Sequence, residues 1–171
     1  MEAHNARVAS DLGLGAAGDN ADQYLTFMLN GEEYGVDILR VQEIKGWNAT
    51  TRIPNTPHYI RGVMNLRGAI VPIIDLRSRF LMPPIEYTAT TVVIVLKVHN
   101  DGLERTIGFV VDAVSDVYNV SPEQFREAPD FGTHVDTDFI RALATVDQKM
   151  VILLDIDRLM NIEEIGGVVS H

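Results

Sequence analysis

Short segments rich in β-branched and aromatic residues follow one another along this chain, and polar turn residues separate them. Such segments, at this spacing, are typical of barrels or sandwiches of β-strands. Asn30-Gly31 and Asp101-Gly102 each stand between two of them, as the tight turn of a β-hairpin requires. The pattern therefore predicts a mostly β protein. The predicted strand segments are residues 23–29, 33–38, 60–66, 69–75, 89–98, 105–112, 140–146 and 149–155.

Only short helices fit between these segments. One candidate is residues 37–44 (DILRVQEI). Two others begin at Asp75 (DLRSRF) and Asp155 (DIDRLMN), where the aspartate can accept hydrogen bonds from the first free backbone amides of a helix.

The chain also contains an internal repeat. Residues 59–80 align without a gap with residues 139–160, and residues 34–44 align with residues 107–117. We therefore expect two copies of one β unit, roughly residues 23–85 and 86–161, each with about five strands and a closing helix. A unit of that size buries a thin core, so the two units are expected to pack against each other. The matched pairs are Ile60/Ile140, Arg61/Arg141, Val71/Val151, Asp75/Asp155, Gly35/Gly108, Val41/Val114, Glu43/Asp116 and Ile44/Val117.

Composition narrows the possible functions. The 171 residues carry a net charge of −10, which opposes binding to nucleic acid and to anionic lipid surfaces. The absence of cysteine excludes disulfides, thiolate zinc sites and cysteine nucleophiles. The longest apolar runs, residues 92–96 and 150–154, are far shorter than the roughly 20 residues that span a bilayer, so direct membrane insertion is not expected. Residues 1–10 lack the apolar stretch of a signal peptide, so a cytoplasmic location is expected.

The two ends of the chain have a different texture. Residues 1–22 show neither a helical nor a strand period and are expected to form a flexible tail, and residues 162–171 are expected to form a C-terminal tail. Residues 13–18 (GLGAAG) spell the G-x-G-x-x-G motif of dinucleotide sites, but that loop works only between a strand and a helix. Because no strand precedes it, a flexible linker is the favoured interpretation.

Catalytic motifs are nearly absent. The five histidines are scattered, and the serines stand in no nucleophile motif, so neither a hidden triad nor another nucleophilic enzyme is favoured. The acidic pairs 136/138 and 155/157 could serve a metal or glycosidase site only if they converged in a pocket. A solvated loop for the first pair and a helix cap for the second are the simpler interpretations, so we expect no catalytic residue, cofactor or metal ion.

Features suited to protein contact remain. Residues 41–44 (VQEI) and their repeat counterpart combine branched apolar residues with an acid at a connector between strands. Val41 and Val114 could equally belong to the core. Arg67 precedes Gly68 and therefore belongs at a hairpin tip with its guanidinium directed outward. It is either an ordinary exposed charge or an anchor of an interface, since arginine is enriched in binding hot spots.

Several stretches closely resemble the CheW family of bacterial chemotaxis adaptors, in matching order from about residue 20 to 162. They are EEYGVDILRVQEI, TRIPNTP, IRGVMNLRGAIVPIIDL, TVVIVL, VVDAVSDV and MVILLDIDRL. The resemblance implies one CheW-like domain over residues 23–161, built from two five-stranded SH3-like β-barrels around a shared hydrophobic core. It implies no catalysis and no cofactor. Its partners would be methyl-accepting chemotaxis receptors and the regulatory domain of the histidine kinase CheA, reached by recruitment to membrane-associated receptor arrays.

The resemblance also assigns residues to two surfaces. An adaptor or a detached kinase regulatory domain of a non-chemotactic pathway is the alternative function. A CheV-type protein would carry a receiver domain in addition. The implied receptor-binding residues are Arg67, Val41, Gly62, Val92, Gly108, Val114 and Val117, and the implied kinase-binding residues are Ile38, Val41 and Glu43.

Overall fold

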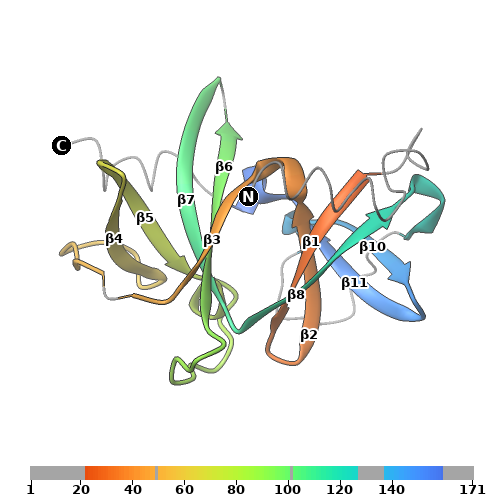
Figure 1. Ribbon diagram of the computed structural model, residues 1–171, viewed down its shortest axis with the longest axis horizontal. Helices are drawn as coiled ribbons and strands as arrows, with labels where there is room; N and C mark the ends of the chain where they lie inside the picture. Colours follow the sequence, from red (N-terminus) through yellow and green to blue (C-terminus); the bar gives the residue numbers. More distant parts are fainter. Residues whose placement is uncertain (1–21, 49, 101, 127–136, 160–171) are drawn as a thin grey trace.

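The strands of a computed structural model form two sheets that lie side by side (Figure 1). The structure describes residues 22–48, 50–100, 102–126 and 137–159. The predicted mostly β fold with a few short helices is confirmed. The strands are β1 (Asp22–Leu29), β2 (Glu32–Asp37), β3 (Val41–Gly46), β4 (Ile60–Leu66), β5 (Ala69–Asp75), β6 (Val92–Asn100), β7 (Leu103–Val111), β8 (Ala113–Val120), β9 (Phe125–Arg126), β10 (Ile140–Val146) and β11 (Lys149–Leu154). The helical turns are η1 (Ile38–Arg40), α2 (Leu76–Arg79), η2 (Pro122–Gln124), η3 (Thr137–Phe139) and α3 (Ile156–Leu159).

Each sheet combines strands from both halves of the sequence. The β1 barrel has the strand order β8-β1-β2-β11-β10-β9, and the β3 barrel has the order β3-β6-β7-β5-β4. The predicted boundary near residue 85 therefore does not separate the two sheets. The reason is a reciprocal exchange: β2 pairs in parallel with β11, and β7 pairs in parallel with β5. In Figure 1 the β3 barrel is on the left and the β1 barrel on the right.

The internal repeat is nevertheless real in three dimensions. β4–β5–α2 and β10–β11–α3 are equivalent hairpins followed by a short helix. Ile73 is the register partner of Gly108, and Leu153 is the register partner of Gly35, so aligned residues meet aligned glycines. A Cβ at Gly35 would lie 2.9 Å from Leu153 Cδ2, and one at Gly108 would lie 2.7 Å from Ile73 Cδ1. Both parallel pairings thus need a glycine for close approach.

A shared core joins the barrels, as expected. It contains buried side chains from both sheets, including Phe27 and Tyr34 of the β1 barrel and Ile94 and Phe109 of the β3 barrel. Each barrel also has a smaller cluster of its own, one around Tyr24 and one in the β3 barrel that includes Ile73. Burial of this apolar surface is the main force that holds the barrels together.

Two of the three predicted helices are present. Asp75 accepts a hydrogen bond from Ser78 N at 3.3 Å and caps α2, and Asp155 accepts one from Arg158 N at 3.2 Å and caps α3. The predicted helix over residues 37–44 is wrong. There the chain makes only the single turn η1 and then enters β3, whose alternating burial and pairing with β6 are those of a strand.

Candidate protein-interaction surfaces

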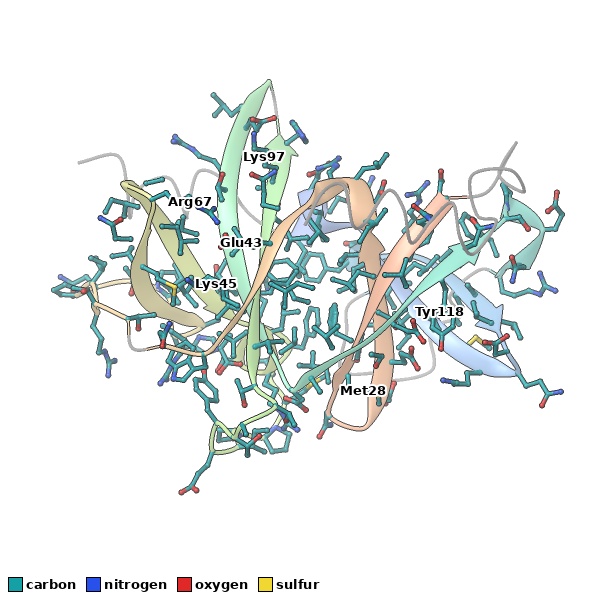
Figure 2. The ribbon with its side chains drawn as sticks, in the orientation of Figure 1. Met28, Glu43, Lys45, Arg67, Lys97 and Tyr118 are labelled. Atoms are coloured by element: carbon teal, nitrogen blue, oxygen red, sulfur yellow. The ribbon has the colours of Figure 1, made fainter. Side chains whose placement is uncertain are left out.

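Arg67 occupies the tip of the β4–β5 hairpin, as predicted. Arg67 and Gly68 have φ angles of 53° and 86°, and Gly68 N donates a hydrogen bond to Asn65 Oδ1 at 2.9 Å. The Arg67 side chain is 83% exposed, yet its Nη1 atom lies 2.8 Å from Glu43 Oε2. Figure 2 shows the two side chains facing each other across the barrel end. The hairpin tip therefore presents a cation to solvent and is tethered to β3.

The residues implied to contact the kinase lie on η1 and β3. Ile38 and Val41 are half-buried and pack against the shared core, and the Glu43 side chain is 20% exposed. β3 is an edge strand of its sheet, with β6 as its neighbour. Sequence reasoning missed two apolar residues beside them, Leu39 at 84% exposure and Ile44 at 43%. The apolar residues of DILRVQEI were visible in the sequence, but the helix predicted there gives the wrong set of solvent-facing positions.

Three of the valines implied to contact the receptor have similar surroundings. Val92 begins β6 in the β3 barrel, whereas Val114 and Val117 lie on β8 in the β1 barrel. Each is half-buried and packs against the shared core. From the sequence, Val41 and Val114 could belong either to the core or to the surface. In the structure each does both, because it lies at the rim of the core and keeps part of its side chain exposed. Both barrels therefore contribute valines to that rim.

Gly62 and Gly108 have a different character, because both are buried. Gly62 has a φ of 139° at a bulge in β4, and a Cβ there would collide with the backbone oxygen of Thr51. Gly108 faces Ile73 and Val93 within the β3 barrel. Their lack of a side chain is explained by internal packing, and they can shape a surface only through the backbone they position.

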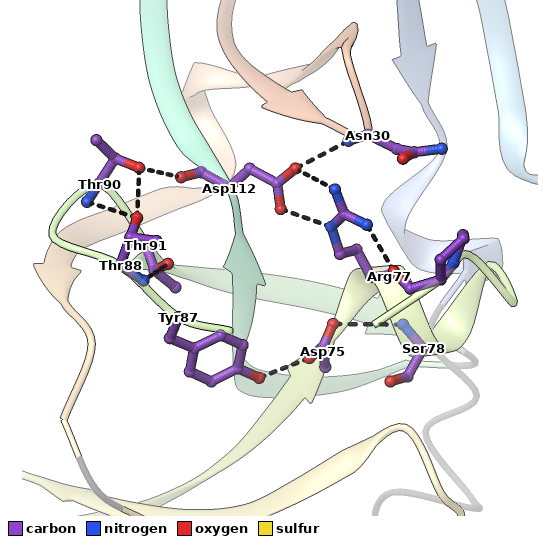
Figure 3. Close-up of polar contacts among 10 residues, drawn as sticks. Asn30, Asp75, Arg77, Ser78, Tyr87, Thr88, Thr90, Thr91 and Asp112 are labelled. Atoms are coloured by element: carbon purple, nitrogen blue, oxygen red, sulfur yellow. Dashed lines mark hydrogen bonds and ion pairs between the residues drawn. The ribbon is translucent and has the colours of Figure 1, made fainter. Parts of the chain in front are cut away.

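A polar network holds the crossing between the barrels (Figure 3). Arg77 of α2 donates two hydrogen bonds of 2.9 Å to Asp112, the residue that links β7 to β8. Asp112 Oδ2 also accepts from Asn30 N in the β1–β2 turn at 2.9 Å. The hydrogen bond to Asp112 is the main cause that raises the pKa of Arg77. Nearby, Tyr87 donates its hydroxyl to Asp75, and burial, followed by this hydrogen bond, raises the pKa of Tyr87.

A second ion pair ties η1 to α3. Arg40 donates hydrogen bonds of 2.9 and 2.7 Å to the two carboxylate oxygens of Asp157, and His99 N donates to Asp157 Oδ1 at 2.7 Å. Burial opposes ionisation of Asp157, but these hydrogen bonds outweigh it and hold its pKa below the ordinary value. Asp157 is therefore a structural residue.

The acidic pairs do not converge on a metal site in the described part of the chain. Asp155 caps α3, and Asp157 is engaged by Arg40. Asp138 lies in η3, whereas position 136 and the GLGAAG segment lie outside the described residues. Within the described ranges, no three His, Cys, Asp or Glu side chains are grouped as metal ligands would be, and no helix is long and apolar enough to cross a membrane.

Comparison with known proteins gives concordant matches. A family model described as a CheW-like domain matches residues 23–164. Chemotaxis protein CheW of Klebsiella aerogenes is 49% identical over 153 residues, covering 89% of this chain and 90% of that protein. Chemotaxis protein CheW of Bacillus subtilis is 32% identical and covers 83% of this chain and 88% of its own. The crystal structure of the scaffolding protein TtCheW from Thermoanaerobacter tengcongensis superposes with a TM-score of 0.74 at 32% identity, covering 84% of this chain and 90% of that one.

Proposed function

This chain belongs to the CheW family of non-catalytic chemotaxis scaffolds, and we propose that it couples the cytoplasmic tips of chemoreceptors to the histidine kinase CheA. In this role it works without a cofactor and is recruited from the cytoplasm to membrane-associated receptor arrays. The single observation that carries the proposal is the exposed, tethered Arg67.

The receptor surface is proposed to be formed by Arg67 together with the rim valines. A receptor tip is a helical hairpin, and half-buried valines can accept the apolar face of such a helix. Val92 comes from one barrel and Val114 from the other, so a helix seated on both would depend on how the barrels are arranged. The guanidinium of Arg67 would add directed hydrogen bonds to a carboxylate or carbonyl on the receptor.

The kinase surface is proposed to be η1 with β3. An open strand edge beside exposed apolar residues is suited to docking of another barrel. Leu39 and Ile44 supply exposed apolar area there, next to the implied contact residues Ile38 and Val41. Because Glu43 on this surface is paired with Arg67, a receptor carboxylate that engages Arg67 would change the charge balance of the kinase surface.

A charge reversal at Arg67 tests the proposal. Arg67→Glu should abolish most receptor control of CheA in a reconstituted system without unfolding the protein, since the Arg67 side chain is 83% exposed and only its partner Glu43 is largely buried. Arg158→Glu is the matched control, because Arg158 is 69% exposed and lies 3.9 Å from an acidic neighbour, Asp155. It should leave coupling intact.

Two results would contradict the assignment. Loss of the fold in Arg67→Glu would show that Arg67 is structural. Binding of the wild-type chain to CheA in co-sedimentation, without receptor control of kinase activity, would favour a detached regulatory domain or an adaptor of a non-chemotactic pathway.

A further inference from the structure

A pocket of about 330 Å³ lies on the β1 barrel, where the β1–β2 turn adjoins the beginning of β11. Figure 2 shows Met28 near this turn and Tyr118 on β8 of the same barrel. The volume lies at the lower end of the range for ligand pockets. Met150 in its wall is 54% exposed, so part of its apolar surface faces solvent. The apolar lining is Met28, Met150 and Ile152, and the charged lining is Glu32, Glu33 and Lys149.

Glu33 is a buried carboxylate whose hydrogen bonding is incomplete. Its side chain is 8% exposed, and its Oε2 atom is shielded from solvent without a hydrogen-bond partner. The other oxygen, Oε1, lies 3.6 Å from Lys149 Nζ, which is longer than a hydrogen bond. A buried acceptor left unsatisfied is costly, so a donor that reached both oxygens would be strongly favoured.

The Lys149 side chain lies over this carboxylate but is held there only weakly and can move away. Its side chain is 55% exposed, and its ammonium group donates a 3.2 Å hydrogen bond to the hydroxyl of Tyr118. Lysine ammonium groups are strongly hydrated and their stems are flexible, so Lys149 can turn outward into water. Glu33 would then be open to another cation from the side of the pocket.

We propose that this pocket binds an arginine side chain of a partner protein, which displaces Lys149 and pairs with Glu33. A planar guanidinium can donate to both carboxylate oxygens at once, which a single ammonium group does not do. Its aliphatic stem suits the adaptable thioether walls of Met28 and Met150. The exposed carboxylate of Glu32 and the net charge of −10 add charge complementarity. The proposal does not depend on receptor or kinase coupling.

Titration of the full chain with N-acetyl-arginine amide, followed by ¹H–¹⁵N NMR, tests the pocket directly. Saturable shifts are expected at the amides of residues 28–33 and 149–152. N-acetyl-citrulline amide, which is isosteric but uncharged, should produce none. Equal shifts with citrulline, or saturable shifts centred elsewhere, would overturn the proposal.

Three variants separate binding from folding. Glu33→Gln should weaken binding of the arginine amide by roughly tenfold or more, whereas Lys149→Ala should tighten it because the competing cation is gone. Lys45→Ala on β3 is the control and should leave the affinity unchanged. Unaltered binding in Glu33→Gln, or weaker binding in Lys149→Ala with the fold intact by NMR, would refute the displacement mechanism. Self-association of the chain that is lost in Glu33→Gln would show that a second copy is the occupant, against the proposal.

Discussion

Glycine has two distinct uses at the residue scale in this molecule. At Gly68 it allows a left-handed turn, with a φ of 86° and no atom within 4 Å of where a Cβ would be. At Gly62 the φ of 139° is combined with a steric barrier from the backbone, because the Thr51 carbonyl lies too close to the position that a Cβ would take. The first requirement is conformational only, whereas the second is conformational and steric. A Cβ at Gly62 therefore cannot be accommodated by rotating a side chain.

Alanine substitutions should separate these two uses. Gly62→Ala should lower the free energy of unfolding by roughly 3 kcal/mol or more, since Thr51 and Val63 would have to give up their mutual backbone hydrogen bonds. Gly68→Ala should cost only about 1 kcal/mol. Urea denaturation of both variants measures the difference. Equal losses of stability in the two variants would show that the backbone at Gly62 relaxes freely. Receptor binding by Gly62→Ala should be compared with that of a variant of equal stability.

At the scale of elements, a single carboxylate joins three segments that are distant in sequence. Asp157 in α3 accepts hydrogen bonds from Arg40 of η1 and from the backbone of β6 at His99. η1 also leads directly into β3, whose outer surface is the proposed kinase contact. The Arg40–Asp157 ion pair thus holds η1, and with it the beginning of β3, in place. The strength of this ion pair should depend on pH.

The pH dependence has a definite sign. Because the folded state lowers the pKa of Asp157 below its ordinary value of 3.8, the ion pair contributes its full stability above that value and loses it as pH falls through the folded pKa. Asp157→Asn should therefore be less stable than wild type at pH 7, and the difference should shrink as pH falls below about 4. Urea unfolding between pH 3 and 7 measures it.

A second substitution assigns this effect to its cause. In an Arg40→Met background, the additional cost of Asp157→Asn at pH 7 should be smaller, because the strongest hydrogen-bond donor is already absent. A cost that is the same with and without Arg40, or that stays constant with pH, would show that Asp157 acts by another route.

The local sequence predicted some elements better than others. Asp75 and Asp155 were predictable caps because an aspartate satisfies the amides of its own helix. The helix expected over 37–44 failed because pairing with β6 decides the conformation of β3, and a partner strand leaves no mark in the local pattern. Pro72 lies within β5, an interior strand of its sheet, where a proline is not expected.

Neighbouring strands explain how β5 tolerates that proline. Val63, its register partner, exchanges backbone hydrogen bonds with Thr51 and so directs its polar groups away from β5. The side of Pro72 that lacks an N–H therefore faces β7, whose parallel pairing with β5 begins only at Ile73. The proline occupies a local edge inside an interior strand. Only the pairing of three strands reveals this edge, so it cannot be recognised from the local sequence.

Across the whole molecule, the sequence predicted the repeat but not the exchange of hairpins. The spacing of hydrophobic residues shows which side of a strand is buried but not which strand lies next to it. Because the two repeat units bury similar sides, a strand of one unit could pair with its own unit or with the other. The same limit applies to the sites. Arg67 was recognisable beside Gly68, whereas Glu33 and Lys149 meet only because β2 pairs in parallel with β11. Long-range pairing is the information that local patterns lack.

Because the two halves of the sequence exchange strands, the two barrels form one cooperative unit. Among the described residues, the shared core holds 22 buried hydrophobic side chains, against six in the separate cluster of each barrel. Neither barrel retains a contiguous chain or an adequate core without the other. The protein should therefore unfold in one transition. Trp47, the single tryptophan, packs against Tyr87 at 4.6 Å and reports on the β3 barrel alone.

Phe27→Leu tests this coupling from the opposite barrel. Phe27 is fully buried in the β1 barrel, so the substitution should remove roughly 1–2 kcal/mol of stability through a local packing defect. In a single cooperative unit, the fluorescence transition of Trp47 should shift to lower urea by the same amount as the circular-dichroism transition. Phe109→Leu in the β3 barrel should give the same coincidence. If Phe27→Leu shifted the circular-dichroism curve while Trp47 kept its wild-type midpoint, the barrels would be unfolding separately, and the rim valines would belong to two surfaces that move independently.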